Sequence, residues 1–300
     1  MYRLLEICKK YGIECREQVS LADYSTFKIG GPAALIIMPK TEDEVICLCK
    51  ASKSFKLPLL PLGKGSNILF ADKGYSGVLL QLSGGLRDIT LQDDTKIVCG
   101  AGVSLTRLCA FACENGLSGL EFAYGIPGTL GGAVYMNAGA YSGEMKDVVV
   151  SAAHITPDGV RGMLSSDELN FAYRHSAYFG RDDIITSAVL QLKKADKAEI
   201  RECMEDYLTR RRDKQPLEYP SAGSTFKRPE GAYASELVDR CGLKGMSVGG
   251  AMVSKKHAGF LINHNNATAK DMLALIEHVK NEVKIKTGFE LECEIKQIGF

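Results

Sequence analysis

Short apolar runs alternate with glycine-containing turns along the first two hundred residues. Three of these runs, residues 34–38, 77–82 and 96–99, are rich in aliphatic side chains and are bounded by Gly, Pro or Asp. Each has the length of a β-strand. The pattern therefore predicts several short strands in this part of the chain.

Two helices are expected between these strands. Thr41 is a suitable N-cap with Glu44 three residues later, as in a capping box, and apolar residues follow at helical spacing. Ser104 begins a second amphipathic segment, which the pair Asn115–Gly116 ends. Helices mixed with short strands predict an α+β or α/β fold for this region.

The last hundred residues have a more helical pattern. Residues 199–212 carry an apolar stripe at helical spacing. Residues 268–288 predict another helix, which Thr268 and Asp271 begin as a capping box. A strand over residues 291–298 is expected to close the chain. Because the pattern changes from Ala195 onward, a change of domain is predicted close to residue 197.

Composition narrows the class of protein. The 300 residues are 45% hydrophobic and 24% charged, which excludes a disordered or fibrous chain. The length suits two or three domains. Lys plus Arg number 37 against 36 Asp plus Glu, and this balance argues against a general nucleic-acid binder and favours a monomer. The cations of Arg210–Lys214 either form a solvated helix end or bind an anionic ligand.

Several features favour the cytoplasm. The ten cysteines include no CxxC pair and lie within apolar patterns, so we expect buried free thiols in a reducing compartment. Arg3 and Glu6 interrupt the first apolar residues before a signal-peptide core forms. No apolar run approaches the ~18–20 residues of a membrane helix. No spacing of His, Cys and Asp predicts a metal site.

Three segments, residues 27–33, 62–69 and 124–141, are rich in glycine. Glycine lets the backbone approach a ligand closely, and consecutive N–H groups can bind a pyrophosphate. One such segment alone would indicate a structural turn, whereas three among strands favour a large phosphorylated cofactor. The chain contains neither GxxxxGK[ST] nor GxGxxG, so it is neither a P-loop protein nor a dinucleotide-binding Rossmann protein.

Six short motifs of the chain form a specific set, at residues 25–33, 62–67, 119–129, 173–176, 221–227 and 291–295. Through these motifs the chain resembles, from about Tyr24 to its end, the UDP-N-acetylenolpyruvoylglucosamine reductase family. The resemblance implies an α+β fold in which an FAD-binding region of the vanillyl-alcohol-oxidase type (PCMH fold) has two subdomains. We expect these at residues 1–85 and 86–197, with a C-terminal α+β substrate-binding domain at residues 198–300.

The resemblance also implies a reaction. It is the reduction of UDP-N-acetylglucosamine enolpyruvate to UDP-N-acetylmuramate in peptidoglycan synthesis, with non-covalent FAD and with NADPH as the hydride source. No motif in the sequence reads the 2′-phosphate of NADPH, so NADPH in place of NADH rests on the resemblance alone. The implied FAD-binding residues are Gly63, Lys64, Gly65, Ser66, Asn67, Gly125, Ile126, Pro127, Gly128, Thr129 and Gly132.

Three residues match the family's catalytic positions. The reaction puts negative charge on the substrate carboxylate and needs a proton donor on the opposite face. Arg174 matches the arginine that binds the carboxylate, Ser224 the proton donor, and Glu294 a glutamate near the C-terminus. Without the resemblance each would be an ordinary strand or turn residue. Glu292 and Glu294 share one strand face, and only the family pattern selects Glu294.

Other residues are expected close to the substrate. Lys214 and Lys227 are cations that would help Ser224 ionise, and Arg228 stands where the family usually has an asparagine that contacts the substrate phosphates. After Phe179 there is no room for the insertion whose tyrosine clamps substrate in longer members, so the chain resembles the shorter subtype. His257 is either a nucleotide contact or a surface residue.

Two other functions remain open at this point. One is an FAD-linked oxidase or dehydrogenase on the same flavin-binding fold. Such enzymes often attach the flavin through His or Cys, and the three glycine-rich segments contain neither residue. The other is a flavin- or nucleotide-sensing module without turnover, in which replacing Arg174 or Ser224 with alanine would leave the function intact.

Overall fold

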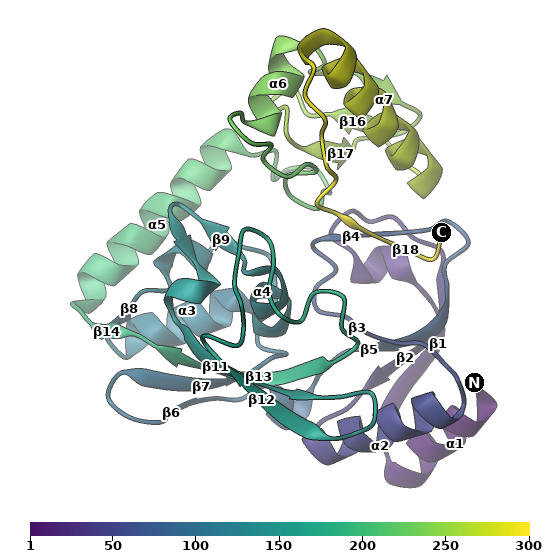
Figure 1. Ribbon diagram of the computed structural model, residues 1–300, viewed down its shortest axis with the longest axis vertical. Coiled ribbons are helices and arrows are strands. Elements are labelled where there is room, and N and C mark those ends of the chain that lie inside the picture. Colours follow the sequence, from purple (N-terminus) through teal and green to yellow (C-terminus); the bar gives the residue numbers. More distant parts are fainter. The chain divides into compact units, whose positions relative to one another are not determined.

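The computed structural model describes all 300 residues, whose helices and strands are drawn in Figure 1. The chain divides into two compact units. Unit one comprises residues 1–17, 35–63 and 77–210. Unit two comprises residues 18–34, 64–76 and 211–300. The expected three-part division at residues 85 and 197 remains a prediction.

The structure contains seven α-helices and four short 3-10 helices. The α-helices are α1 (Tyr2–Tyr11), α2 (Glu42–Ser54), α3 (Leu105–Glu114), α4 (Leu130–Met136), α5 (Lys197–Lys214), α6 (Ala234–Arg240) and α7 (Ala269–Thr287). The 3-10 helices are η1 (Leu21–Tyr24), η2 (Gly84–Arg87), η3 (Glu121–Ala123) and η4 (Met145–Asp147).

The strands form three larger sheets. They are a sheet of order β1 (Glu14–Ser20), β2 (Pro32–Met38), β5 (Tyr75–Leu80), β3 (Leu59–Pro61); a sheet of order β12 (Arg161–Ser165), β11 (Val149–Ile155), β13 (Ile184–Gln191), β7 (Lys96–Gly100), β6 (Ile89–Leu91); and a sheet of order β15 (Ser247–Val248), β16 (Ala251–Val253), β17 (Leu261–Asn263). Three two-stranded pairs complete the pairing: β9 (Gly139–Ala140) with β10 (Gly143–Glu144), β8 (Leu117–Ser118) with β14 (Lys193–Lys194), and β4 (Ile68–Phe70) with β18 (Lys296–Ile298).

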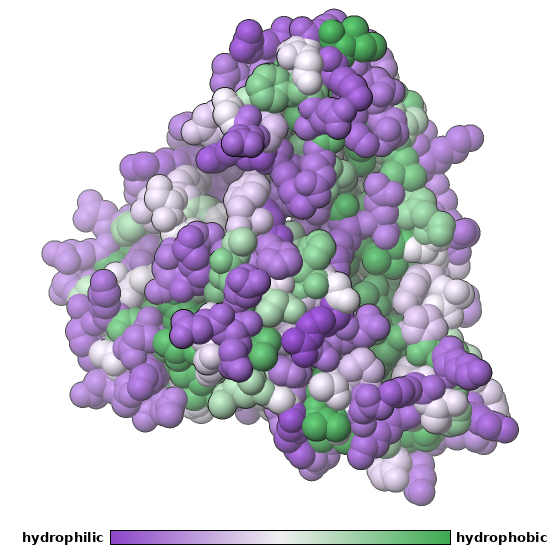
Figure 2. Space-filling view, viewed as in Figure 1, coloured by the Kyte–Doolittle hydropathy of each residue, from purple (hydrophilic) through white to green (hydrophobic).

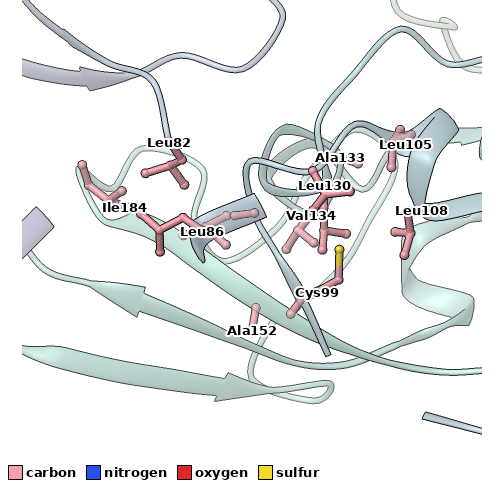
Figure 3. Close-up of a cluster of buried hydrophobic side chains, with 14 of the residues drawn as sticks. Leu82, Leu86, Cys99, Leu105, Leu108, Leu130, Ala133, Val134, Ala152 and Ile184 are labelled. Atoms are coloured by element: carbon pink, nitrogen blue, oxygen red, sulfur yellow. The ribbon is translucent and has the colours of Figure 1, made fainter. Parts of the chain in front are cut away.

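In unit one, α4 packs on the five-stranded antiparallel sheet against β7 and β13. Leu130, Ala133 and Val134 of α4 meet Cys99 of β7 in the buried cluster of Figure 3. Leu105 and Leu108 of α3 extend the same cluster. This apolar packing holds α4 on the sheet, and α4 lies within the glycine-rich segment of residues 124–141.

The capping residues begin their helices as predicted. Thr41 Oγ1 accepts from the Glu44 N–H at 3.2 Å, and Ser104 Oγ accepts from the Arg107 N–H at 3.3 Å. Thr268 and Asp271 form a reciprocal capping box. The expected box at Thr41 is wrong in one detail, because the Glu44 carboxylate accepts from the Lys40 N–H at 2.6 Å and not from Thr41.

Unit two is built around α7. The predicted inward residues Met272, Leu275, Ile276, Val279 and Val283 are all buried, and α6 and the sheet β15–β16–β17 pack against the helix. Three residues distant in sequence, Phe27, Ile29 and Leu69, belong to the same core. Segments around the first two glycine-rich regions therefore fold together with the C-terminal part of the chain.

The closing strand is shorter than predicted. Regular pairing covers Lys296–Ile298 of β18, which runs parallel to β4. Before that, Cys293 forms a single antiparallel bridge with Phe226. The segment changes partner at about Ile295, so it cannot form one continuous strand over residues 291–298.

All ten cysteines are free thiols, and six of them are buried. None of the helices has both the length and the apolar character that a membrane span requires. On the face shown in Figure 2, polar residues interrupt the apolar ones, so exposed hydrophobic side chains are scattered.

Candidate active site

Two glycine-rich segments meet within unit one. A Cβ atom on Gly63 would lie 2.6 Å from Thr129 Oγ1, which is too close for any side chain. Thr129 is the N-cap of α4, and its hydroxyl accepts from the Gly132 N–H at 3.5 Å. Glycine at position 63 thus allows the backbone after β3 to pass directly over the start of α4.

The amides at the start of α4 are already used inside the protein. The Leu130 N–H donates to the Val103 carbonyl and the Gly131 N–H to the Ala101 carbonyl, both at 2.9 Å. Together with the Gly132–Thr129 bond, these contacts satisfy the donors that usually make a helix N-terminus an anion site. The third glycine-rich segment therefore offers a ligand its backbone surface more than free amides of α4.

In unit two, the first two glycine-rich segments pack on each other. Gly65 has φ +60°, and a Cβ there would overlap the Tyr24 carbonyl oxygen. Its own carbonyl accepts from the Thr26 N–H at 3.3 Å. A Cβ on Gly31 would overlap the backbone of Asp72. Chain packing accounts for these glycines, without any ligand.

Arg174 occupies a strained two-residue turn in unit one. Ala172 and His175 exchange two backbone hydrogen bonds of 3.1 Å, with Tyr173 and Arg174 between them. Arg174 has φ +54°, which costs a non-glycine residue about 1 kcal/mol or more. Glycine would avoid this cost. The position therefore keeps the guanidinium group at the expense of local stability.

Contacts on both sides hold this arginine. Its Nη2 donates to the Gly139 carbonyl at 3.4 Å, and its guanidinium lies 5.0 Å from the centre of the Tyr173 ring. Ser176 is fully buried, and its hydroxyl donates to the Tyr135 carbonyl at 2.8 Å. Ser176, the last residue of the motif at residues 173–176, thus anchors the turn and does not face a ligand.

A second strained turn joins β9 to β10. Tyr141 has φ +50° and Ser142 φ +66°, the pattern of a type I′ hairpin turn, which normally takes Asn and Gly. The Tyr141 ring stacks on Tyr207 of α5, with 4.5 Å between ring centroids and 7° between planes. No sequence motif marks these two tyrosines; the one available signal is the absence of Gly and Asn at the two central positions of this turn.

Ser224 is exposed in unit two, directly after Gly223, which has φ +75°. The next residue, Thr225, is fully buried and fixes the turn. Its N–H donates to the Gly259 carbonyl at 2.8 Å, and its Oγ1 accepts from the Leu261 N–H at 3.2 Å. The Ser224 hydroxyl is thereby presented at the surface on a rigid support.

Glu294 lies beside this turn. Its N–H donates to the Thr225 carbonyl at 2.8 Å, and the bridge between Phe226 and Cys293 sets the register. Asn67 of the second glycine-rich segment donates from Nδ2 to the Glu294 carbonyl at 3.2 Å. One local structure therefore contains Ser224, Glu294 and Asn67.

Glu292 and Glu294, which shared a face in the sequence pattern, have different surroundings. Glu292 is exposed and pairs with Lys227 at 2.5 Å, whereas Glu294 is half-buried. The charge of Lys227 is thus largely balanced by Glu292. That pairing reduces its expected effect on the ionisation of Ser224.

The remaining candidate cations are at the surface of unit two. Lys214 is exposed at the end of α5. The exposed Arg228 places its guanidinium 4.4 Å from the centre of the Tyr233 ring. His257 is half-buried: its ring meets Phe260 edge-on, and its Nδ1 accepts from the Gly259 N–H at 3.2 Å. Burial lowers the pKa of His257, so the ring stays neutral near pH 7.

Two family models match the chain. Residues 215–298 match the C-terminal domain of UDP-N-acetylenolpyruvoylglucosamine reductase, and residues 33–161 match an FAD binding domain. A relative from Syntrophomonas wolfei with that reductase name is 48% identical over 93% of both chains. The chain belongs to this reductase family. The resemblance on which the sequence analysis rested is confirmed.

Solved structures agree with the reductase fold. The UDP-N-acetylenolpyruvylglucosamine reductase of Thermus caldophilus is 36% identical, covers 96% of this chain and 99% of its own, and has a TM-score of 0.81. An alkyldihydroxyacetonephosphate synthase, 19% identical, covers 65% of this chain and 44% of its own with a TM-score of 0.50, which shows shared fold alone. The predicted α+β class, with a flavin-binding region followed by the reductase C-terminal domain, is confirmed.

The glycines of the FAD-binding region test whether the chain fits the cofactor. Gly63 and Gly131 pack closely against the protein, with neighbouring atoms 2.6 and 3.0 Å from the position of a Cβ. Gly128 and Gly132 do not: the nearest atoms are 3.5 and 3.6 Å away, and neither has a positive φ. Since glycine weakens a helix, the exposed Gly132 is best explained by close approach of a ligand. The region fits FAD.

Proposed function

We propose that this protein reduces UDP-N-acetylglucosamine enolpyruvate to UDP-N-acetylmuramate with NADPH, using non-covalently bound FAD. The observation that carries the proposal is the 48% identity to the Syntrophomonas wolfei reductase over 93% of both chains. The product is a peptidoglycan precursor, so the activity serves cell-wall biogenesis, cell shape and division. The protein is an FAD-dependent oxidoreductase of the reductase family, and we propose that it acts as a cytoplasmic monomer.

The chain's parts have separate tasks in this proposal. The chemistry that bound FAD would supply is hydride transfer from NADPH to the terminal carbon of the enol ether. The cofactor would be held by Gly63–Asn67 and by Gly125–Thr129 with Gly132. The domains would be residues 1–85 and 86–197 for the cofactor and 198–300 for the substrate.

Arg174 would bind the carboxylate of the enolpyruvyl group. A guanidinium can donate two parallel hydrogen bonds to a carboxylate, and its charge stabilises the negative charge that develops there. The strained φ of Arg174 and the contact with the Gly139 carbonyl support this role, because strain of this kind persists where function requires it.

Ser224 would donate the proton to the carbon next to the carboxylate. A serine hydroxyl is a weak acid, so its ionisation needs support from neighbouring groups. The cations Lys214 and Lys227 would provide this support, and Glu294, half-buried on the adjacent segment, would lie against the substrate. Lys214, Lys227 and Arg228 would contact the anionic nucleotide, with Arg228 in the place of the family's asparagine.

Anaerobic absorbance spectroscopy tests the proposal. The holoenzyme is mixed first with NADPH and then with UDP-N-acetylglucosamine enolpyruvate. Loss of the flavin absorbance with NADPH and its return with the enolpyruvyl nucleotide are expected. Absorbance that disappears but does not return would remove the substrate and leave an FAD-linked dehydrogenase of other specificity. A colourless protein that cannot be reconstituted with FAD would overturn the whole proposal.

A further inference from the structure

Asn137 is a buried polar residue to which the proposed mechanism assigns no task. It ends α4 as the C-cap, with φ 43° and ψ 55°, and its exposure is 0%. Glycine is the usual residue at such a left-handed cap, and asparagine is the common substitute. The cap alone therefore does not explain why an amide side chain is buried here.

The Asn137 amide has three partners. Its Nδ2 donates to Glu144 Oε2 at 2.7 Å and to the Ala172 carbonyl at 3.0 Å, and its Oδ1 accepts from the Lys146 N–H at 2.9 Å. Only one orientation of the amide satisfies two acceptors and one donor at once. The side chain is thus rigidly held, with both of its N–H groups used.

These partners flank Arg174. Ala172 closes the two-residue turn that contains Arg174. Glu144 lies on β10, and the paired strand β9 supplies the Gly139 carbonyl that accepts from Arg174 Nη2. One buried amide therefore ties the end of α4 to both segments that hold the arginine.

We propose that Asn137 is a positioning residue that keeps the Arg174 guanidinium in place for the substrate carboxylate. The inference rests on the proposed function of Arg174. The turn stores strain at Arg174, so it needs an external bond to stay closed, and the bond from Asn137 Nδ2 to the Ala172 carbonyl supplies it. Loss of that bond would let the turn relax and move the guanidinium.

The principal variant is Asn137→Gly, which suits the left-handed backbone and removes only the amide. Asn170→Gly is the matched control, because Asn170 has the same φ of 43° but is exposed. In stopped-flow measurements on the holoenzyme, we expect Asn137→Gly to slow the return of flavin absorbance with the enolpyruvyl nucleotide by about 10- to 100-fold. The bleaching by NADPH should change less than about twofold, and the control should match wild type in both steps.

A second readout does not depend on activity. Trypsin cleaves after arginine, so the rate of cleavage between Arg174 and His175 reports how firmly the turn is closed. We expect faster cleavage there in Asn137→Gly than in wild type or Asn170→Gly. If Asn137→Gly does not fold, Asn137→Asp replaces it, since aspartate tolerates the left-handed conformation but loses both Nδ2 bonds.

Arg174→Ala, measured in parallel, distinguishes the proposed role of Arg174 in binding the carboxylate from the proposed positioning role of Asn137. If Arg174→Ala returns the flavin absorbance at the wild-type rate, the proposed role of Arg174 fails. If Arg174→Ala is slow while Asn137→Gly has wild-type kinetics and wild-type cleavage, only the positioning role is overturned. In the double variant, Asn137→Gly should slow the return of flavin absorbance less than about threefold beyond the rate of Arg174→Ala alone. If the two rate defects multiply in full, Asn137 does not act through Arg174 and the positioning role is refuted.

Discussion

Replacing Gly132 with alanine should stabilise the protein and weaken FAD binding. Gly132 lies within α4, has no positive φ, and a methyl group there would meet Thr129 Oγ1 at 3.6 Å, an ordinary van der Waals distance. Alanine is more favourable than glycine in a helix by about 0.5–1 kcal/mol. The apoprotein should therefore melt about 1–3 °C higher.

The cofactor should respond in the opposite direction. If FAD contacts the exposed surface of α4 at position 132, a methyl group there would hold the cofactor away from the helix. We expect the Kd for FAD to rise at least roughly tenfold, equivalent to about 1.4 kcal/mol. Titration of the apoprotein with FAD, followed by flavin fluorescence, measures this Kd. Gly131→Ala is the contrast within the same helix, because its methyl would lie 3.0 Å from the Ala101 Cβ and should lower the melting temperature.

Two results would refute this reasoning. Unchanged FAD affinity in Gly132→Ala would show that the cofactor does not approach this helix face, and Gly132 would lose its assigned role. A lower melting temperature of the apoprotein would show that the protein itself needs glycine at position 132, contrary to the distances around it.

Three further predictions concern catalysis and pH. Arg174→Gly should relieve the strained turn and raise the melting temperature, yet slow the substrate-dependent return of flavin absorbance by about 10²–10³-fold. Glu294→Gln should reduce kcat strongly, whereas Glu292→Gln, which breaks an exposed ion pair worth at most about 1 kcal/mol, should change kcat less than about threefold. Burial lowers the pKa of His154, so the unfolded state binds the proton more readily, and thermal stability should fall as pH drops below 6.5. His154→Gln should flatten that slope in melting curves; equal slopes would contradict the assignment.

Local signals in the sequence predicted α2, α3, α5 and α7, whereas α1, α4 and α6 were not predicted. The caps Thr41, Ser104 and Thr268 begin helices where expected, because capping depends on bonds within one turn. The inward face of α7 followed from apolar spacing for the same reason. Which face of a helix is apolar depends on residues within a few turns of one another, so the sequence was enough to predict the buried face, although its partners in the core include residues far away in the chain.

Long-range pairing was beyond such signals. The closing segment pairs first with Phe226 and then with β4, and the backbone of Glu294 is held by Thr225 and Asn67, both far away in sequence. The alternation of strand residues therefore did not distinguish Glu292 from Glu294. Their different exposure depends on contacts with residues distant in sequence, which the alternation does not encode. The expectation that the glycine-rich segments bind a ligand together stays a prediction, and Gly31 and Gly65 have a second reason to be glycine, because a Cβ there would overlap neighbouring backbone atoms.

The residues that break local rules are concentrated around Arg174. Nine non-glycine residues have positive φ, and five of them lie between Asn137 and Arg174. The tertiary structure offsets this strain through the bonds of Asn137 and the stacking of Tyr141 on Tyr207. Sequence-based rules place Gly or Asn in such turns, so Tyr141 and Arg174 are the positions at which they must fail. That failure is itself informative: side chains kept at a conformational cost, with buried residues devoted to holding them, mark the part of unit one where we expect the substrate carboxylate to bind.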